Sequence, residues 1–487
     1  MWRRTRRQTA RLQKLQGWGA QLDSFNAPFS AKDVQALQAA MQGDVVLPSD
    51  DGYASARLLS NLAFQHFPLL IAYCEVFSDV RQCLAFAHRY KLHVTTRSGG
   101  HSTAGFSSND GMVIDTSRMN GVYVDPLAKR AVVGPGTNWA HLNATLADYQ
   151  LHVPTGVCGD VCVAGFMQGG GYGLTSRKWG INCDRVVDMM VMLADGRIVH
   201  ANERQHPDLF WALRGGTGNN FGILLQATYE LVDLPELWGF GLRWTLDQAP
   251  EAMEALQQGY MAHGISDDIG YMGAFVFEGG ADMKSPALII RGVCWSGEKT
   301  GKQLLKPLIK ATGAKMPISR TGSFNFLNDW LFEHPEPVPN SPDLAREDKQ
   351  SAIIAKKYKA KDWKKVCQLF KQSPNPWSCF AIEPYGGAIN RMPRDATAFV
   401  HRDADMDFFV DVFWMTEPQR IEAQAWLDEC MKTIDKMSNG ESYQNYPRIT
   451  QLDFRERYWK EAFPRLLEIK KKYDPKDFFW YAQSVSA

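Results

Sequence analysis

Short apolar runs alternate with glycine turns between residues 68 and 232, a pattern typical of strands joined by tight loops. Residues 80–90 and 138–149 instead repeat apolar positions with helical spacing. Asp195-Gly196 predicts a hairpin, because both central positions of the favoured turn need positive φ. The runs whose composition predicts strands are 112–115, 130–134, 189–194 and 197–201.

Beyond about residue 235 the pattern changes to longer segments rich in aromatic and β-branched residues, which favour an antiparallel sheet. Three such segments are IGYMGAFVFEGG, ALIIRGVCW and DFFVDVFWM. A proline cluster at positions 335–342 predicts a long surface loop, because proline cannot continue a strand ladder. Residues 454–473 have helical spacing, and we expect Pro464 to begin a fresh helix that Asp474-Pro475 ends.

The length of 487 residues and the 45% share of hydrophobic residues predict a large core and two packed domains. A formal net charge of +1 favours neither nucleic acid nor an anionic membrane, so a small molecule is the expected partner. The basic opening MWRRTRRQTARLQKLQGWG lacks the apolar run of a secretory signal or membrane span. We expect a cytoplasmic protein, with twin-arginine export as the minor alternative.

The nine cysteines are scattered and odd in number, which does not suit a disulfide framework. We expect most of them to be buried thiols. Cys158 and Cys162 differ, because both lie in the most glycine-dense part of the chain. Their spacing, without a matching second pair, does not fit a zinc site, and we expect no metal.

Three glycine clusters lie beside predicted strands. The first, RSGGH at 97–101, presents His101 on a tight turn, which is compatible with a ligand loop or with a plain surface turn. The second, residues 154–180, contains eight glycines and favours a loop that contacts a phosphate-bearing cofactor, with a simple connector as the alternative. The third, residues 214–223, leads into the alternating run ILLQATYEL. Neither a dinucleotide fingerprint nor a Walker lysine is present, so one extended ligand with phosphates fits best.

These clusters resemble the FAD domain of the berberine bridge enzyme-like branch of the vanillyl-alcohol oxidase flavoproteins. RSGGH resembles the site where that family bonds a histidine, here His101, to the flavin 8α methyl group. TGVC resembles the site where it bonds a cysteine, here Cys158, to flavin C6. DLFWALRGGTGNNFGI and the ending YDPKDFFWYAQSV resemble two further family motifs.

The resemblance implies bicovalent FAD and an α+β fold of the vanillyl-alcohol oxidase type. Its expected parts are an FAD-binding domain at 1–235, a substrate domain at 236–452 with a large antiparallel sheet covered by helices, and a segment at 453–487 that returns to the FAD domain. Cofactor contacts are expected, besides His101 and Cys158, from Arg97, Ser98, Gly99, Gly100, Ser102, Gly165, Gly169, Gly170, Gly173, Gly218, Asn220, Gly222, Ile223, Tyr481 and Gln483.

The segment ESYQNYPRI resembles a family motif whose second tyrosine, here Tyr446, serves as the base. This role requires cations or hydrogen bonds that lower the tyrosine pKa, and Arg448 is a candidate for holding a phenolate. The alternative is a core aromatic side chain. The strand that resembles the family's substrate-facing strand contributes Glu383 and Asn390 as further catalytic candidates, and a structural role is equally open for Glu383.

Two positions bear on the reaction with dioxygen and with the cofactor. The family resemblance implies that Val161 leaves room for O2, so we expect an oxidase that forms hydrogen peroxide rather than a dehydrogenase with another acceptor. Family members commonly have a histidine at the position of Phe166, so this chain departs from the family pattern near Cys158 but not near His101.

The substrate is weakly constrained by the sequence. A sugar hydroxyl, a hydroxyl of a secondary metabolite, and an amine or oxidative cyclisation in natural-product biosynthesis all remain open. So do a singly attached FAD and a binding protein without turnover. The second domain supplies aromatic side chains for stacking, although strand alternation places many of them in the core: Trp244, Tyr271, Phe275, Phe277, Trp295, Phe409, Phe413 and Trp414.

Overall fold

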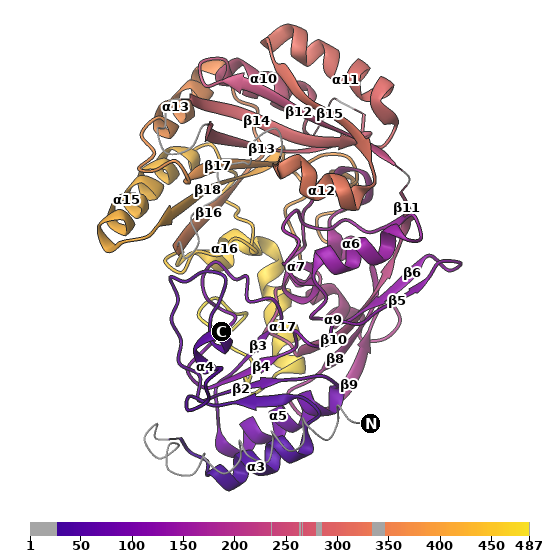
Figure 1. The fold of residues 1–487 in the computed structure, drawn as a ribbon, viewed down its shortest axis with the longest axis vertical. Helices are drawn as coiled ribbons and strands as arrows, with labels where there is room; N and C mark the ends of the chain where they lie inside the picture. The colour runs from indigo at the N-terminus through magenta and orange to yellow at the C-terminus, as the bar shows by residue number, and fades with distance from the viewer. Residues whose placement is uncertain are drawn as a thin grey trace.

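The computed structural model describes residues 27–234, 236–262, 264, 266–278, 285–333 and 346–486. The chain forms two stacked halves (Figure 1). The indigo and magenta half contains the N-terminal sheets, and the orange half contains one large sheet. The predicted proline loop at 335–342 and the basic start lie outside the described residues. No helix within the described ranges is long and apolar enough to cross a bilayer.

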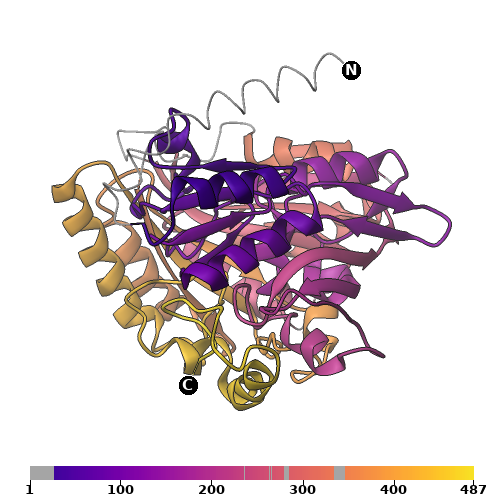
Figure 2. The ribbon, with the colours of Figure 1, turned by 90° about the horizontal axis from the view of Figure 1, so that it is seen from below.

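The first sheet has four strands in the order β1-β2-β4-β3, and α3 and α5 pack against it (Figure 2). β4 pairs in parallel with both β2 and β3, and β1 pairs antiparallel with β2. The strand predicted at 112–115 is confirmed as β4. The bounds are β1 Asp44–Val46, β2 Leu70–Tyr73, β3 Val94–Arg97, β4 Met112–Asp115, α3 Ala31–Ala40, α4 Tyr53–Ala56 and α5 Phe77–Tyr90.

The second sheet is antiparallel, with strand order β5-β6-β10-β8-β9. The predicted hairpin joins β8 to β9, but its turn differs from the expected one, because only Gly196 has positive φ, at 81°. The Gly196 N–H donates to the Leu193 carbonyl, and Leu193 N–H donates to the Arg197 carbonyl. This arrangement is a turn followed by a bulge at glycine, which needs one left-handed residue instead of two.

The remaining elements of this half connect the two sheets to the loops described below. Their bounds are β5 Val122–Asp125, β6 Arg130–Val133, α6 Trp139–Ala147, β7 Leu151–His152, α7 Val163–Gln168, α8 Ser176–Trp179, the 3-10 helix η2 Asn182–Arg185, β8 Val186–Met192, β9 Ile198–Ala201, α9 Pro207–Ala212, β10 Ile223–Glu230 and β11 Val232–Asp233. The Asn138 side chain caps α6 by accepting from the His141 N–H, so this helix begins where the sequence pattern predicted.

The upper half is a seven-stranded antiparallel sheet in the order β15-β12-β14-β13-β17-β18-β16. The three aromatic segments of the sequence are confirmed as β13, β14 and β18. The bounds are β12 Leu237–Thr245, α10 Ala249–Gly259, β13 Ile269–Glu278, β14 Ser285–Cys294, α11 Gly297–Thr312, β15 Lys315–Gly322, α12 Phe324–Glu333, β16 Arg346–Ile354, α13 Ala360–Phe370, β17 Cys379–Pro384, α14 Ala388–Arg391, β18 Met406–Trp414 and α15 Glu417–Ile434.

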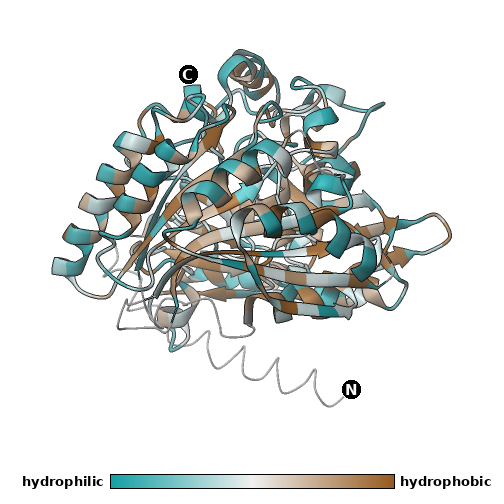
Figure 3. Cartoon of the chain, turned by 90° about the horizontal axis from the view of Figure 1, so that it is seen from above, coloured by the Kyte–Doolittle hydropathy of each residue, from teal (hydrophilic) through white to brown (hydrophobic). Residues whose placement is uncertain are grey.

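One face of this sheet is covered by α10, α11, α13 and α15 (Figure 1), and their apolar side chains form a core with it. Figure 3 shows hydrophilic residues along these covering helices and mostly hydrophobic residues on the strands beneath them. Side chains alternate between the two faces of each strand. The odd-numbered positions of β17 and β18 therefore point away from this core and toward the lower half.

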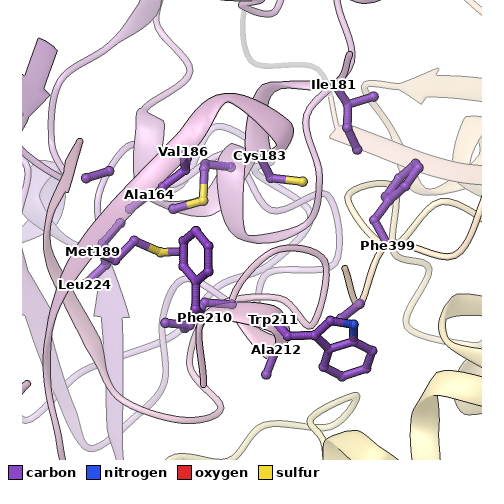
Figure 4. Close-up of a cluster of buried hydrophobic side chains, with 14 of the residues drawn as sticks. Ala164, Ile181, Cys183, Val186, Met189, Phe210, Trp211, Ala212, Leu224 and Phe399 are labelled. Atoms are coloured by element: carbon purple, nitrogen blue, oxygen red, sulfur yellow. The ribbon is translucent and has the colours of Figure 1, made fainter. Parts of the chain in front are cut away.

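The C-terminal segment returns to the lower half, where its yellow helices lie (Figure 1). It consists of α16 Phe454–Tyr458, the 3-10 helix η4 Lys460–Ala462 and α17 Phe463–Tyr473. Pro464 lies in the first turn of α17, and Asp474 ends the helix, as the sequence predicted. Leu466 and Ile469 belong to the same buried cluster as Trp211 of α9. Figure 4 shows Trp211 in this cluster, together with Phe399 from the upper half, which points toward Ile181.

A buried ammonium group holds this segment in place. Lys470 Nζ donates to Asp474 Oδ2 at 2.6 Å, to the Phe479 carbonyl at 2.5 Å and to the Asn220 carbonyl at 2.8 Å. The Asn220 side chain in turn accepts from the Val485 N–H at 2.8 Å. One cation therefore ties the third glycine loop to the end of the chain.

Replacing Lys470 by methionine is expected to destabilise the protein by about 3 kcal/mol, because the buried Asp474 carboxylate loses its cation. The melting temperature should fall clearly below that of the wild-type protein. Lys471→Met, at the neighbouring exposed position, is the matched control and should leave the melting temperature nearly unchanged. Equal melting temperatures for the two variants would contradict this role of Lys470.

Candidate functional site

A cavity of about 590 Å³ lies between the two halves. One wall consists of loops at residues 98–103, 156–166 and 217–224, which include parts of all three glycine clusters. The other wall is the inner face of the large sheet, from β13, β14, β16, β17 and β18. A ligand in the cavity therefore lies between glycine-rich loops on one side and inward-facing side chains of the sheet on the other.

The RSGGH turn follows β3 and lines the cavity. Gly100 has φ of 73°, a conformation that favours glycine, and a Cβ on Gly99 would lie 3.1 Å from Cys162 Sγ. Among the described residues, no acceptor pairs with the backbone N–H groups from Ser98 to Ser102. Successive free N–H groups on a glycine turn suit the negative charges of a phosphate-bearing or electron-rich ligand.

His101 and Cys158, the two expected attachment points, line this same cavity. His101 Nε2 lies 3.0 Å from Asp160 Oδ2, and this contact lowers the Asp160 pKa. The Cys158 thiol is exposed at the cavity wall, while the surrounding protein raises its pKa by desolvation. All nine cysteines, each within the described residues, are free thiols.

The third glycine loop and the C-terminal motif meet at the cavity. Tyr481 Oη lies 2.7 Å from Thr217 Oγ1, and Gln483 Nε2 donates to the Arg448 carbonyl at 2.7 Å. The expected contacts that do line the cavity, besides His101 and Cys158, are Ser98, Gly99, Gly100, Ser102, Gly165, Gly218, Gly222, Ile223, Tyr481 and Gln483. Phe166 lines it too, with its ring against Trp139 at a centroid distance of 4.9 Å.

Six expected site residues do not line the cavity, and each has another role in the fold. Arg97 pairs with Asp115, and Asn220 holds the third glycine loop. Asn390 accepts from the Gly386 N–H and donates to the Ala404 carbonyl, so its amide is used within the loop after β17. The three glycines allow close approaches, because a Cβ on each would collide with a neighbour: Gly169 with Asn445, Gly170 with Phe399 and Gly173 with Thr155.

Tyr446 and Glu383 meet at the sheet wall of the cavity. The Tyr446 hydroxyl donates to Glu383 Oε1 at 2.5 Å. Burial raises the pKa of Glu383 to about 7, although the hydrogen bond from Tyr446 and the charge of Lys349 oppose the shift. Burial, together with the charge of Glu383, raises the pKa of Tyr446 well above its usual value. The expected lowering of the tyrosine pKa is therefore absent, and the carboxylate is the better proton acceptor of the pair.

A buried cation beside this pair was not predicted from the sequence. Lys349 Nζ lies 2.9 Å from Glu347 and 2.8 Å from Asp411, and 4.9 Å from the centre of the Tyr446 ring. The two carboxylates raise its pKa, so it stays charged. The pattern Glu347-x-Lys349 could have indicated this, because strand positions two apart share a face.

Arg448, expected near the phenol, pairs instead with Asp348 and Asp428 and does not line the cavity. Of the aromatic side chains proposed for stacking, only Phe409 and Phe413 line it. Trp244, Tyr271, Phe275, Phe277 and Trp414 belong to the core under the helices, and Trp295 packs beside α12. Val161, the position expected to face dioxygen, lies in the loop wall.

Comparison with known proteins agrees with this geometry. Residues 68–202 match the model of an FAD binding domain, and residues 442–486 match the model described as berberine and berberine like. These two matches contain the RSGGH turn, the Cys158 loop, Tyr446 and the C-terminal motif.

Relatives extend the similarity over nearly the whole chain. The uncharacterized FAD-linked oxidoreductase YgaK of Bacillus subtilis is 28% identical, with 91% of this chain and 97% of the relative covered. The carbohydrate oxidase of Microdochium nivale is 26% identical, with 93% and 94% covered. The structure of Physcomitrella patens BBE-like 1 has the same fold, with a TM-score of 0.83 at 22% identity over 93% of this chain and 99% of that one.

The two domain matches, the full-length relatives and the shared fold of a helix-covered antiparallel sheet above an FAD domain lead to one assignment. The cavity between the halves is the place where its loops would hold FAD, because the free N–H groups fit the cofactor's negative charges. The chain is an FAD-linked oxidoreductase that resembles the berberine bridge enzyme-like proteins over nearly its whole length.

Proposed function

We propose that this oxidoreductase oxidises an alcohol to a carbonyl compound, with FAD tethered at His101 and Cys158 and dioxygen as the electron acceptor. The observation that carries the proposal is the hydrogen bond from Tyr446 to Glu383 at the cavity wall opposite the two attachment points. A sugar or a hydroxyl of a secondary metabolite is the expected donor. The carbohydrate oxidase of Microdochium nivale among the relatives supports a sugar.

The proton path follows from the two pKa shifts. The Tyr446 hydroxyl accepts the proton of the substrate hydroxyl while its own proton passes to Glu383 Oε1, 2.5 Å away. Glu383, with a pKa of about 7, is matched to accept a proton near neutral pH. Tyr446 thus touches the substrate and acts as base through Glu383. Bound FAD would supply the acceptor for the hydride that leaves the substrate carbon and would pass the two electrons to O2, which gives hydrogen peroxide.

Lys349 supports this transfer by charge. Its ammonium lies against the Tyr446 ring and favours negative charge on the phenol oxygen as the proton moves. The neighbouring Asp407 has a pKa raised well above its usual value by burial and by the charge of Glu383, and its side chain accepts a hydrogen bond from the Ser351 hydroxyl at 2.6 Å. Glu383 and Asp407 are register partners, and Glu383 is the one that accepts the hydrogen bond from Tyr446.

Two attachment points are proposed because both side chains line one cavity. The FAD-loaded wild-type protein, denatured and weighed by mass spectrometry, should be heavier than the polypeptide by one FAD. His101→Ala and Cys158→Ala should each keep the added mass through the other bond, and the double variant should lose it. Cys379→Ala, at a thiol elsewhere on the cavity wall, is the control and should keep the added mass. Colourless acid-precipitated wild-type protein would contradict both attachments.

Tyr446→Phe should lower kcat by about 10²- to 10⁴-fold, because proton transfer from the hydroxyl loses its acceptor. The measurement is hydrogen peroxide formed with the most active donor of a panel of sugars, alcohols and amines. Tyr385→Phe is the matched control, because the Tyr385 hydroxyl is buried and has no partner among the described residues. Wild-type kcat for Tyr446→Phe would refute its role, and turnover without peroxide would indicate a dehydrogenase.

The pH dependence tests Glu383. The group must be ionised to accept a proton, so kcat/KM should rise with pH through about 7 and then level off. Glu383→Gln should lower kcat/KM and abolish this rise, since the amide does not titrate. If kcat/KM of the Glu383→Gln variant still rises at the same pH, a group other than Glu383 causes the rise.

A further inference from the structure

Arg291 is a second buried cation on the cavity wall, and the reaction proposed above does not use it. The side chain lies on the inner face of β14 and is 5% exposed. Its Nε donates to the Leu331 carbonyl at 3.1 Å, and Nη1 donates to the Ile290 carbonyl at 3.2 Å. These bonds leave the Nη2 group without a protein acceptor among the described residues.

No carboxylate among the described residues forms an ion pair with Arg291. The charge of Glu278 acts only from a distance, where it favours the charged form of Arg291. Burial lowers its pKa to about 10, so it is still a cation at neutral pH. A buried charge without a counter-ion is costly. A ligand that brings an anion into the cavity removes this cost, and the planar guanidinium fork matches a carboxylate in particular.

The sheet register fixes how far this cation lies from the proton acceptor. Arg291 pairs with Met272 on β13, and continuing the β13–β17 register by one residue beyond the Gly273–Ile382 pair places Met272 opposite Glu383. The Arg291 and Glu383 backbones are therefore two strand spacings apart, roughly 10 Å. A ligand of moderate size can reach both.

The cation at the opposite end of the cavity differs from Arg291. Lys349 already pairs with Glu347 and Asp411, so it has carboxylate partners without a ligand. An anionic group is therefore favoured at Arg291 over Lys349, which orients a ligand along the inner face of the sheet.

We propose that the substrate is an alcohol that also carries a carboxylate, which Arg291 binds while the hydroxyl lies at Tyr446. Uronic acids and aromatic acids with a hydroxymethyl group have this chemistry. The proposal rests on the proposed function for the position of the hydroxyl, but the binding of the carboxylate can be measured without turnover.

The binding experiment uses the FAD-loaded full-length protein and the change of flavin absorbance on titration with benzoate or benzamide. Benzoate should bind at least about 10-fold more tightly than benzamide, as expected for a charge-assisted bond to a guanidinium. Arg291→Gln should weaken benzoate binding by about 10- to 100-fold, and Arg291→Lys should restore part of it. Arg320→Gln, at an exposed arginine on β15, is the control and should bind benzoate like the wild type.

A turnover experiment completes the test by comparing galacturonate and para-(hydroxymethyl)benzoate with their methyl esters. The acid should have the higher kcat/KM, and Arg291→Gln should reduce this preference. Equal affinities for benzoate and benzamide in the wild-type protein would overturn the proposal, even if Arg291→Gln failed to fold. In that case neutral alcohols could still be oxidised, and the proposed function would stand. If benzoate binds through Arg291 but no alcohol yields peroxide, the proposed function fails instead.

Discussion

Strand alternation in the seven-stranded sheet is the constraint on which the site depends. Even-numbered residues of β17 and β18 pack under the helices, and odd-numbered ones face the cavity. Because neighbouring strands are in register, Glu383 and Asp407 stand side by side on the inner face. A shift of one residue would bury these charges in an apolar core and expose aromatic rings to the cavity. The same pairing that stabilises the sheet therefore fixes the order of the charged groups along the wall.

The opposite wall depends on glycine for a different reason. A cofactor held by backbone N–H groups needs loops that come close to it and to each other. Gly173 has no room for a side chain, and a Cβ on Gly99 would press tightly against Cys162. The fold holds these loops by a few buried polar contacts, chiefly those of Lys470 and Asn220 with the C-terminal segment. The last residues of the chain thus help to shape a loop more than 200 positions earlier in the sequence.

Local patterns predicted the elements well, because strand alternation, helix caps and prolines act within a few residues. The strands at β4, β13 and β18 and the start of α6 follow from such patterns. The residues that the sequence singled out and that line the cavity come from contiguous motifs, such as RSGGH and ESYQNYPRI. Lys349 and Arg291 lie on strands without a motif, and what places them in the cavity is long-range strand pairing. Asn390 is the opposite case. It was proposed from a contiguous motif, but its amide bonds to the backbone of its own loop and does not line the cavity.

The charged groups of the cavity divide into two kinds with different consequences. Lys349 already has its counter-ions, Glu347 and Asp411. It therefore influences Tyr446 by its electrostatic field and adds little affinity for a ligand. Arg291 has none among the described residues, so the free energy of its desolvation is recovered when a ligand supplies the anion. Chemistry and recognition are thereby separated along one face of the sheet. Substitutions at the Tyr446 end should act mainly on kcat, and substitutions at the Arg291 end on the choice of substrate.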